Sequence, residues 1–502
     1  MNRTENIRWP NRNGHLTRTS VMALLMALCA STEMSAQDAG DSAYTRNQQT
    51  SVNPQLEAYI SEGLESNQAL RQKQLDYARS LAALKGARGL FFPDLSVNAR
   101  YTMAEGGRII EFPVGDLLNP VYSTLNILTA SDMFPQLENQ EFPFYRPREQ
   151  ETKLSLVQPI FNADIVYNYR IQKQYTEISR IDVDQYEREL VKEITKAYYD
   201  YQKAENLLWL ADTSYSLVKE NNRVSRRLLE NDKVTIDAVY RSEAEMSQVE
   251  VQQAQASNMK EASQAYFNFL LNRPLNTEIV LLRTEPYQLD ISLEEATNQA
   301  VQNRIELRQV QQYQVLNQYV ADLHRGKNIP GVYGAVDYGY QGEKYRFTKD
   351  DDFLLASLVL RWTLFQGTVN RQKVQETMIE GQKLEALYDE TTQQITMEVI
   401  NTYYAVRAAF EAVQSARAQT RSARRAYELI SRKYSEGQSP LLELIDARTS
   451  LTRAAANAII AQAEYFIQMA DFEYAIGAGL PADEMGPALS DHDSASAVPA
   501  DE

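Results

Sequence analysis

Residues 160–190 read IFNADIVYNYRIQKQYTEISRIDVDQYEREL, and they open the stretch that decides the fold. From Ile160 to Arg273 the chain has 114 consecutive residues with neither glycine nor proline, rich in Ala, Gln, Glu, Arg and Leu. These residue types favour helix, whereas glycine and proline interrupt it. The sequence therefore predicts helix on a very long scale.

A second region of the same kind runs from Thr368 to Gly477 and is interrupted only by Gly381, Gly437 and Pro440. Each region contains one break, the polar tetrad 230–233 in the first and residues 436–440 in the second. Each region is thus predicted to be a hairpin of one long and one shorter helix. A long arm of roughly 70 residues would reach about 100 Å.

The two regions are copies of one unit. Ala197-Tyr198-Tyr199 recurs as Thr402-Tyr403-Tyr404 at an offset of 205 residues. At an offset of 237, Leu70-Arg71, Pro93 and Tyr101 return as Leu307-Arg308, Pro330 and Tyr338. Phe161 returns as Phe365 at an offset of 204. The offset between the copies falls from 237 to 204 residues, so the first copy has 33 extra residues, which lie within the proline-rich stretch 103–150. That stretch is predicted to be a long loop.

Segments of strand period flank this loop and its short counterpart. Leu95, Val97, Ala99 and Tyr101 alternate with polar residues, and the segment 332–341 alternates in the same way. With the return segments 152–159 and 353–363, four strands of about ten residues result. They fit either two hairpins of a soluble sheet or part of a membrane barrel. Four strands cannot close a barrel, so a membrane version must pool strands from several chains.

Composition narrows the class of protein to which the chain can belong. Arg3, Arg8, Arg12 and Arg18 precede the short apolar run 21–29, and Met34-Ser35-Ala36 follows, so residues 1–36 are predicted to be a cleaved signal peptide. Cys29 is the single cysteine, and bulky Leu28 before it argues against lipidation. A net charge of −16 argues against nucleic acid as a partner.

No enzyme signature is found. The three histidines are His15, His324 and His492, too scattered for a metal cluster or a catalytic triad, and neither a phosphate-binding glycine loop nor a nucleophile elbow is present. We therefore expect no catalytic residues, no metal and no cofactor. No later stretch has about 18 uninterrupted apolar residues, so a helical membrane span is not expected.

From about Leu56 to Gly479 the chain resembles the TolC family of outer-membrane efflux proteins. The resemblance rests on linked motifs: Ala87-Arg88 with Phe92-Pro93-Asp94-Leu95-Ser96; Gln158-Pro159-Ile160-Phe161 with Thr363-Leu364-Phe365-Gln366-Gly367; and Tyr434-Ser435-Glu436-Gly437 with Leu444-Ile445-Asp446-Ala447.

This resemblance implies a mainly helical fold with a small β component. It implies a homotrimer in which a 12-stranded β-barrel, four strands from each chain, crosses the lipid of the outer membrane and continues as an α-helical barrel into the periplasm. The implied function is a passive channel of a tripartite efflux or type I secretion system for small molecules or proteins. Its implied partners are a periplasmic adaptor (a membrane fusion protein) and an inner-membrane pump of RND or ABC type.

The resemblance also assigns an acidic ring at the pore entrance. Its positions here are Glu443 and Asp446, and a spacing of three places both carboxylates on one helix face. Such a ring attracts cations. The plainer alternative is an ordinary solvated helix face, and the first repeat has Asp237 and Tyr240 at these positions.

In the family, hydrogen bonds between neighbouring tip helices hold the entrance shut. Tyr434 and Asp237 occupy the positions of one such bond, whereas Ser439 stands where the best-known members use an arginine, with Ile236 opposite. On this assignment, Tyr434→Phe with Asp237→Ala should raise single-channel conductance. The adaptor-contact tips correspond to Glu230, Asn231 and Asp232 and to Glu436, Gly437 and Gln438, which are equally suited to turning the chain.

The expected organisation follows from these elements. It is a signal peptide 1–36; an extension 37–53; a first repeat 54–272 with strands 94–102 and 152–159 and a tip near 230–234; an equatorial linker 273–291; a second repeat 292–480 with strands 332–341 and 353–363 and a tip near 436–440; and an acidic disordered tail 481–502. The competing hypothesis is an exported coiled-coil scaffold or adhesin without a pore.

Overall fold

The computed structural model describes residues 53–478. The predicted signal peptide, residues 37–52 of the extension and the acidic tail lie outside the described residues.

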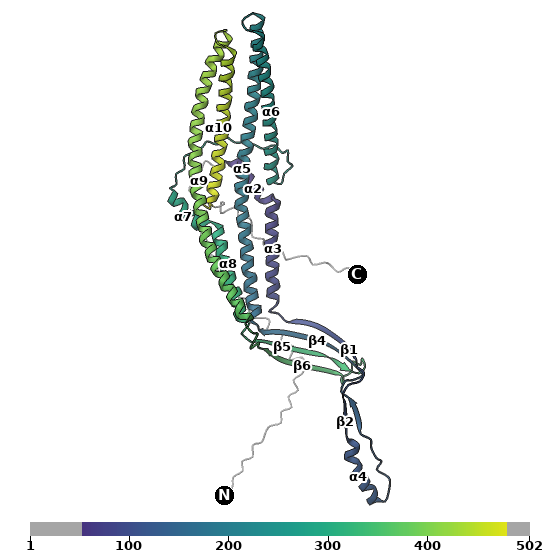
Figure 1. Cartoon of the computed structure of the whole chain (residues 1–502). Coiled ribbons are helices and arrows are strands. Elements are labelled where there is room, and N and C mark those ends of the chain that lie inside the picture. Colours follow the sequence, from purple (N-terminus) through teal and green to yellow (C-terminus); the bar gives the residue numbers. More distant parts are fainter. Residues whose placement is uncertain (1–52, 479–502) are drawn as a thin grey trace. The chain divides into compact units, whose positions relative to one another are not determined.

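Long helices dominate the described chain (Figure 1). They are α2 (Pro54–Ser66), α3 (Gln68–Gly89), α4 (Val114–Thr129), α5 (Ala163–Glu230), α6 (Ile236–Leu270), α7 (Leu293–Asn303), α8 (Ile305–Gly326), α9 (Val369–Ser435) and α10 (Leu441–Ala475). α5 has 68 residues and α9 has 67. At 1.5 Å per residue each is about 100 Å long, as the scarcity of glycine and proline predicts, and Gly381 lies within α9 without interrupting it.

Polar side chains fix where several helices begin. Asn67 ends α2 and caps α3, because its side-chain oxygen accepts the backbone N–H groups of Ala69 and Leu70. Ser292 and Glu295 form a capping box at the start of α7. Arg304 separates α7 from α8, 237 residues after Asn67, so the break between the two short helices is also part of the repeat.

Four strands form one antiparallel sheet in the order β1-β4-β5-β6. They are β1 (Asp94–Met103), β4 (Arg148–Phe161), β5 (Gly331–Gly342) and β6 (Asp352–Arg361). β1 and β6 are the edge strands, and almost all of their side chains are exposed, whereas those of β4 and β5 are mostly half-buried. β4 is longer than its predicted segment 152–159.

The two faces of the sheet differ in polarity. Leu154 pairs with Tyr338 on the apolar face. On the other face the ammonium of Lys153 lies 2.8 Å from a carboxylate oxygen of Asp337. This division follows the alternation in the sequence.

The stretch 103–150, predicted to be a long loop, is folded. The first repeat carries a small folded insertion there, in which α4 is flanked by β2 (Ile109–Phe112) and β3 (Gln140–Pro143), which pair with each other. A ring contact between Tyr122 and Phe134 and the side chains of two asparagines hold α4 to the returning segment. Asn119 and Asn126 each donate to, and accept from, the backbone of the returning segment at Leu137 and Phe134.

The main core lies where both repeats and the segment between α6 and α7 meet. Its largest members are aromatic, and Tyr199 stacks on Phe466 with ring centroids 4.4 Å apart. The hydroxyl of Tyr198 accepts the backbone N–H of Leu282 at 2.8 Å. The hydroxyl of Tyr465 donates to the carbonyl of Tyr287, and burial raises the pKa of Tyr465 to about 12. These tyrosines therefore hold the inter-repeat segment as well as pack between helices.

The duplication extends to every main element. α2, α3, β1, β4, α5 and α6 of the first repeat correspond in order to α7, α8, β5, β6, α9 and α10 of the second. Within the chain, the two repeats are joined by the pairing of β4 with β5 and by the packing of α8 on α5.

Candidate functional site: the helical tips

Two short turns end the helical hairpins. The first turn reverses through Asp232, with a φ of 51°, and the second through Gly437, with a φ of 74°. Glycine adopts this left-handed conformation freely, and aspartate tolerates it better than most other residues do. The six residues assigned to adaptor contact, 230–232 and 436–438, are all exposed in these turns.

The two hairpin tips pack against each other within one chain. A small apolar cluster joins them, made of Ala238, Tyr434, Leu441 and Leu444 with half-buried neighbours from α5 and α9. Leu444 is 1% exposed. The tips are therefore held by a local core of their own.

Tyr434 has a different partner from the one predicted. Its side chain is buried, and its hydroxyl lies 2.9 Å from the hydroxyl of Ser225 on α5. Asp237 instead accepts a hydrogen bond from Thr235, and one of its carboxylate oxygens lies 3.7 Å from Arg241 Nε. Within the single chain Tyr434 is therefore bonded to α5, and Asp237 contacts neighbouring residues at the start of α6, so the latch between Tyr434 and Asp237 stays a prediction.

Ser439 also has a partner within the single chain. It is buried, and its hydroxyl donates to a carboxylate oxygen of Glu443 at 2.5 Å. The two residues are four apart at the start of α10, so Ser439 fixes the direction of the Glu443 side chain. Glu443 also lies in the first turn of α10, where the helix dipole favours a negative charge.

Glu443 and Asp446 are both exposed on α10, one helical turn apart. Leu441, Leu444 and Ala447 of the same helix are buried. The two carboxylates are therefore directed away from the packed side of α10, and the structure of the single chain leaves them facing solvent.

Sequence reasoning missed the buried ion pair of the tips. Arg448 on α10 donates from Nε to Glu245 on α6 at 3.0 Å, and each side chain is only 7% exposed. The other oxygen of Glu245 has no hydrogen-bond partner among the described residues. The sequence contained a signal for this ion pair, because Arg448 continues the buried face of α10 and Glu245 continues that of α6. A charged residue on a buried helix face requires a partner.

Within residues 53–478 no group of three or more His, Cys, Asp or Glu side chains is arranged to hold a metal ion. In the same range, none of the helices combines the length and the apolar character that crossing a membrane would need.

The fold is shared with solved outer-membrane channels. The Campylobacter jejuni CmeC channel is 15% identical with a TM-score of 0.70, and the match covers 89% of this chain and 94% of that one. The open state of Neisseria gonorrhoeae MtrE is 18% identical with a TM-score of 0.67, covering 88% and 97%. Vibrio cholerae VceC is 13% identical with a TM-score of 0.67, covering 84% and 96%. The described chain thus has the fold of these solved channels.

A family model matches the second half of the sequence. Residues 296–478, almost the whole second repeat, match the family model described as outer membrane efflux protein, while no curated protein sequence matches the chain. This part of the chain is therefore similar to the outer membrane efflux proteins.

Proposed function

We propose that three copies of this chain form a passive exit duct, through which an inner-membrane pump of RND or ABC type delivers small molecules or proteins to the outside. The observation that carries this proposal is a four-stranded sheet with two exposed edge strands, connected to helices of about 100 Å. Open strand edges cannot face lipid, so strands of other copies must cover them.

The exposed carboxylates of Glu443 and Asp446 support a cation-attracting entrance. Three copies would bring six carboxylates together at the tips, and such a ring raises the local concentration of cations and repels anions. The exposed turns 230–232 and 436–438 are the surface we assign to a periplasmic adaptor. The single chain offers no second charged residue pair of this spacing at the corresponding place in the first repeat.

Single-channel recordings in planar bilayers test the proposal. The wild-type protein is expected to conduct and to prefer cations, and Glu443→Gln with Asp446→Asn should lower the cation-to-anion permeability ratio. Glu436→Gln removes an equally exposed carboxylate from the adjacent turn and serves as the matched control. An unchanged ratio in the double variant would remove the entrance ring from the proposal.

The competing scaffold is tested with the same preparation. A channel should be extracted from outer-membrane fractions only by detergent and should migrate as a heat-sensitive trimer on gels. A protein that is soluble without detergent and forms no conducting species would favour the scaffold and overturn the duct.

A further inference from the structure

The two helical hairpins differ in charge near their tips. In the first hairpin, residues 216–228 of α5 and 237–250 of α6 contain five basic and five acidic side chains. Their counterparts at the repeat offset of 205 residues, 421–433 of α9 and 442–455 of α10, contain seven basic and three acidic side chains. The second hairpin thus carries an excess of positive charge where the first is balanced.

The first hairpin also pairs some of its cations. Arg223 forms an ion pair with Glu220 on α5, and Arg226 forms one with Glu243 on α6. In the second hairpin, the basic side chains of residues 421–433 are all exposed, and none of them forms an ion pair with another residue in the range 53–478. These positive charges are therefore open to an acidic partner.

Three of the arginines share one face of α9. Arg421, Arg425 and Arg432 lie within about 40° of one another around the helix, at 3.6 residues per turn. Glu428 is the single acidic residue between them. Ala416, on the opposite side of α9, is buried in the hairpin. The three arginines, here called the arginine face, are therefore directed away from the packed side of the hairpin.

The sequence that follows α10 has the complementary charge. Residues 481–502 contain no lysine or arginine and six acidic side chains: Asp483, Glu484, Asp491, Asp493, Asp501 and Glu502. We propose that this acidic tail binds the arginine face of α9. An acidic segment of another protein then reaches these arginines, beside the exposed turn 436–438, only by displacing the tail.

The connection is long enough for this contact. α9 and α10 run side by side (Figure 1), and the hydroxyl of Thr420 donates to the carbonyl of Ala454 at 2.9 Å. From Ala454 to the end of α10 at Ala475 the helix rises about 30 Å. Asp491 follows Ala475 by 16 residues, which span up to about 50 Å when extended. The middle of the tail therefore reaches the level of Arg421.

The tether makes weak ion pairs sufficient. A single exposed ion pair contributes little free energy, because water and salt screen it and two long side chains lose freedom. A tail attached to the same hairpin is present at an effective concentration on the order of 1 mM, and several of its carboxylates can bind at once. A contact of this kind weakens as the salt concentration rises.

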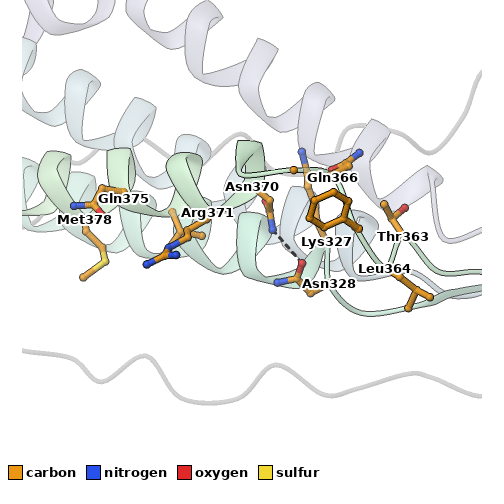
Figure 2. Close-up of a pocket in the computed structure, with 12 residues that line it drawn as sticks. Lys327, Asn328, Thr363, Leu364, Gln366, Asn370, Arg371, Gln375 and Met378 are labelled. Atoms are coloured by element: carbon orange, nitrogen blue, oxygen red, sulfur yellow. Dashed lines mark hydrogen bonds between the residues drawn. The ribbon is translucent and has the colours of Figure 1, made fainter.

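The groove at the start of α9, shown in Figure 2, is a rival location for the tail. It has a volume of about 440 Å³, and the exposed cations Lys327 and Arg371 line it. Apolar Leu364 and Met378 belong to the same lining. Two cations beside apolar side chains suit a segment with six carboxylates less well than the arginine face does.

Disulfide trapping in the full-length protein distinguishes these locations. In a Cys29→Ser background, Ser494→Cys in the tail is combined with one second cysteine. Ala418→Cys lies one turn before Arg421. Its counterpart Thr213→Cys lies at the same level on α5, which also contacts α10, and is the matched control. Gln375→Cys reports on the groove of Figure 2.

At about 0.05 M NaCl we expect crosslinking at Ala418→Cys to be about fivefold faster than at the other two positions. The difference should disappear at about 0.5 M NaCl, where the Debye length falls to about 4 Å. Equal rates at Ala418→Cys and Thr213→Cys in low salt, or a difference that salt does not reduce, would overturn the proposal. Faster crosslinking at Gln375→Cys would place the tail in the groove and overturn it as well.

Charge variants of the same protein test the arginines. Arg421→Gln with Arg425→Gln and Arg432→Gln preserves helix-forming residues and should lower the rate at Ala418→Cys to that of the control. Arg223→Gln with Arg227→Gln, on the first hairpin, should leave the rate unchanged.

A charge swap separates an ionic contact from a merely structural effect. Arg421→Glu with Arg425→Glu should slow crosslinking at Ala418→Cys, and adding Asp491→Lys with Asp493→Lys should restore it. A swapped protein that stays slow would contradict the contact between tail and arginine face. These rates are measured on any oligomeric state, so their failure leaves the exit duct untouched.

Discussion

At the scale of single residues, the buried pair of Glu245 and Arg448 is the most consequential feature of the tips. It joins α6 to α10, and both charges are removed from water, while one carboxylate oxygen of Glu245 has no hydrogen-bond partner among residues 53–478. Buried ion pairs of this kind add little net stability, but losing one member leaves an uncompensated buried charge. The pair therefore acts mainly as a constraint on how the two hairpins meet.

We expect Arg448→Met alone to destabilise the protein by about 3–5 kcal/mol, because Glu245 would remain buried and unpaired. Arg448→Met combined with Glu245→Leu should recover most of this loss. Thermal unfolding of the four proteins of this double-mutant cycle measures the coupling. A double variant as unstable as the single variant would show that the ion pair is not the cause.

Glu187 on α5 provides a pH-dependent prediction. Burial raises its pKa, and the nearby charge of Asp184 adds to the effect. A carboxyl whose pKa is raised by folding costs nothing below its unfolded pKa, and the penalty grows as the pH rises through the folded value. Glu187→Gln should therefore raise the melting temperature more at about pH 7.5 than at about pH 4.

Glu189→Gln is the control for this measurement, because Glu189 is exposed on the same helix. A gain at Glu187 that is equal at both pH values would contradict the desolvation of its carboxylate.

The residue scale also shows the limit of reasoning from the sequence. The acidic pair Glu443 and Asp446 could be placed on one exposed face from its spacing alone. The partner of Tyr434 could not, because Ser225 is 209 residues away and the choice between Ser225 and Asp237 depends on the direction of a buried side chain. Spacing fixes the face of a helix, but not the atom that a side chain reaches.

At the scale of elements, the long helices and the four strands were predictable because each leaves a periodic or compositional signal. The helix α4 was not. Pro120 lies inside it and removes one backbone hydrogen bond, and neighbouring prolines are typical of a loop. Asn119 and Asn126, seven residues apart on one helix face, hold α4 to the returning chain, and polar residues of this kind do not indicate a buried contact.

Asn126→Ala should loosen the insertion. The variant loses one donated bond of 2.7 Å and one accepted bond of 3.0 Å, which leaves backbone groups of Phe134 unpaired at a cost of about 1–3 kcal/mol. Limited proteolysis of the intact protein should then cut faster within residues 130–139. Thr129→Ala, at an exposed position near the end of the same helix, is the control and should leave the rate unchanged.

At the scale of the whole molecule, the insertion appears in only one of two otherwise matching hairpins. β1 and β4 pair from Asp94 opposite Val157 to Met103 opposite Arg148, while β5 and β6 are joined through the short connection 343–351. The matching register of the two hairpins means that the insertion is not needed to align β1 with β4.

Replacing residues 104–147 with a copy of residues 343–351 should therefore preserve the trimer and the single-channel conductance. The heat-sensitive trimer on gels and bilayer recordings measure the two properties. Loss of the trimer would show that the insertion contributes to assembly. A trimer with altered conductance would show that it contributes to the conducting path.

The covalent connection between the repeats limits the number of units and the symmetry of any ring that such chains form. Any closed ring of such chains holds an even number of units, in which linked and unlinked junctions alternate around the circumference. The carboxylates of Glu443 and Asp446 then occur at every second unit only. A binding protein that repeats six times around such a ring would meet two kinds of groove in turn, and a single substitution in the gene would change three of its six sites.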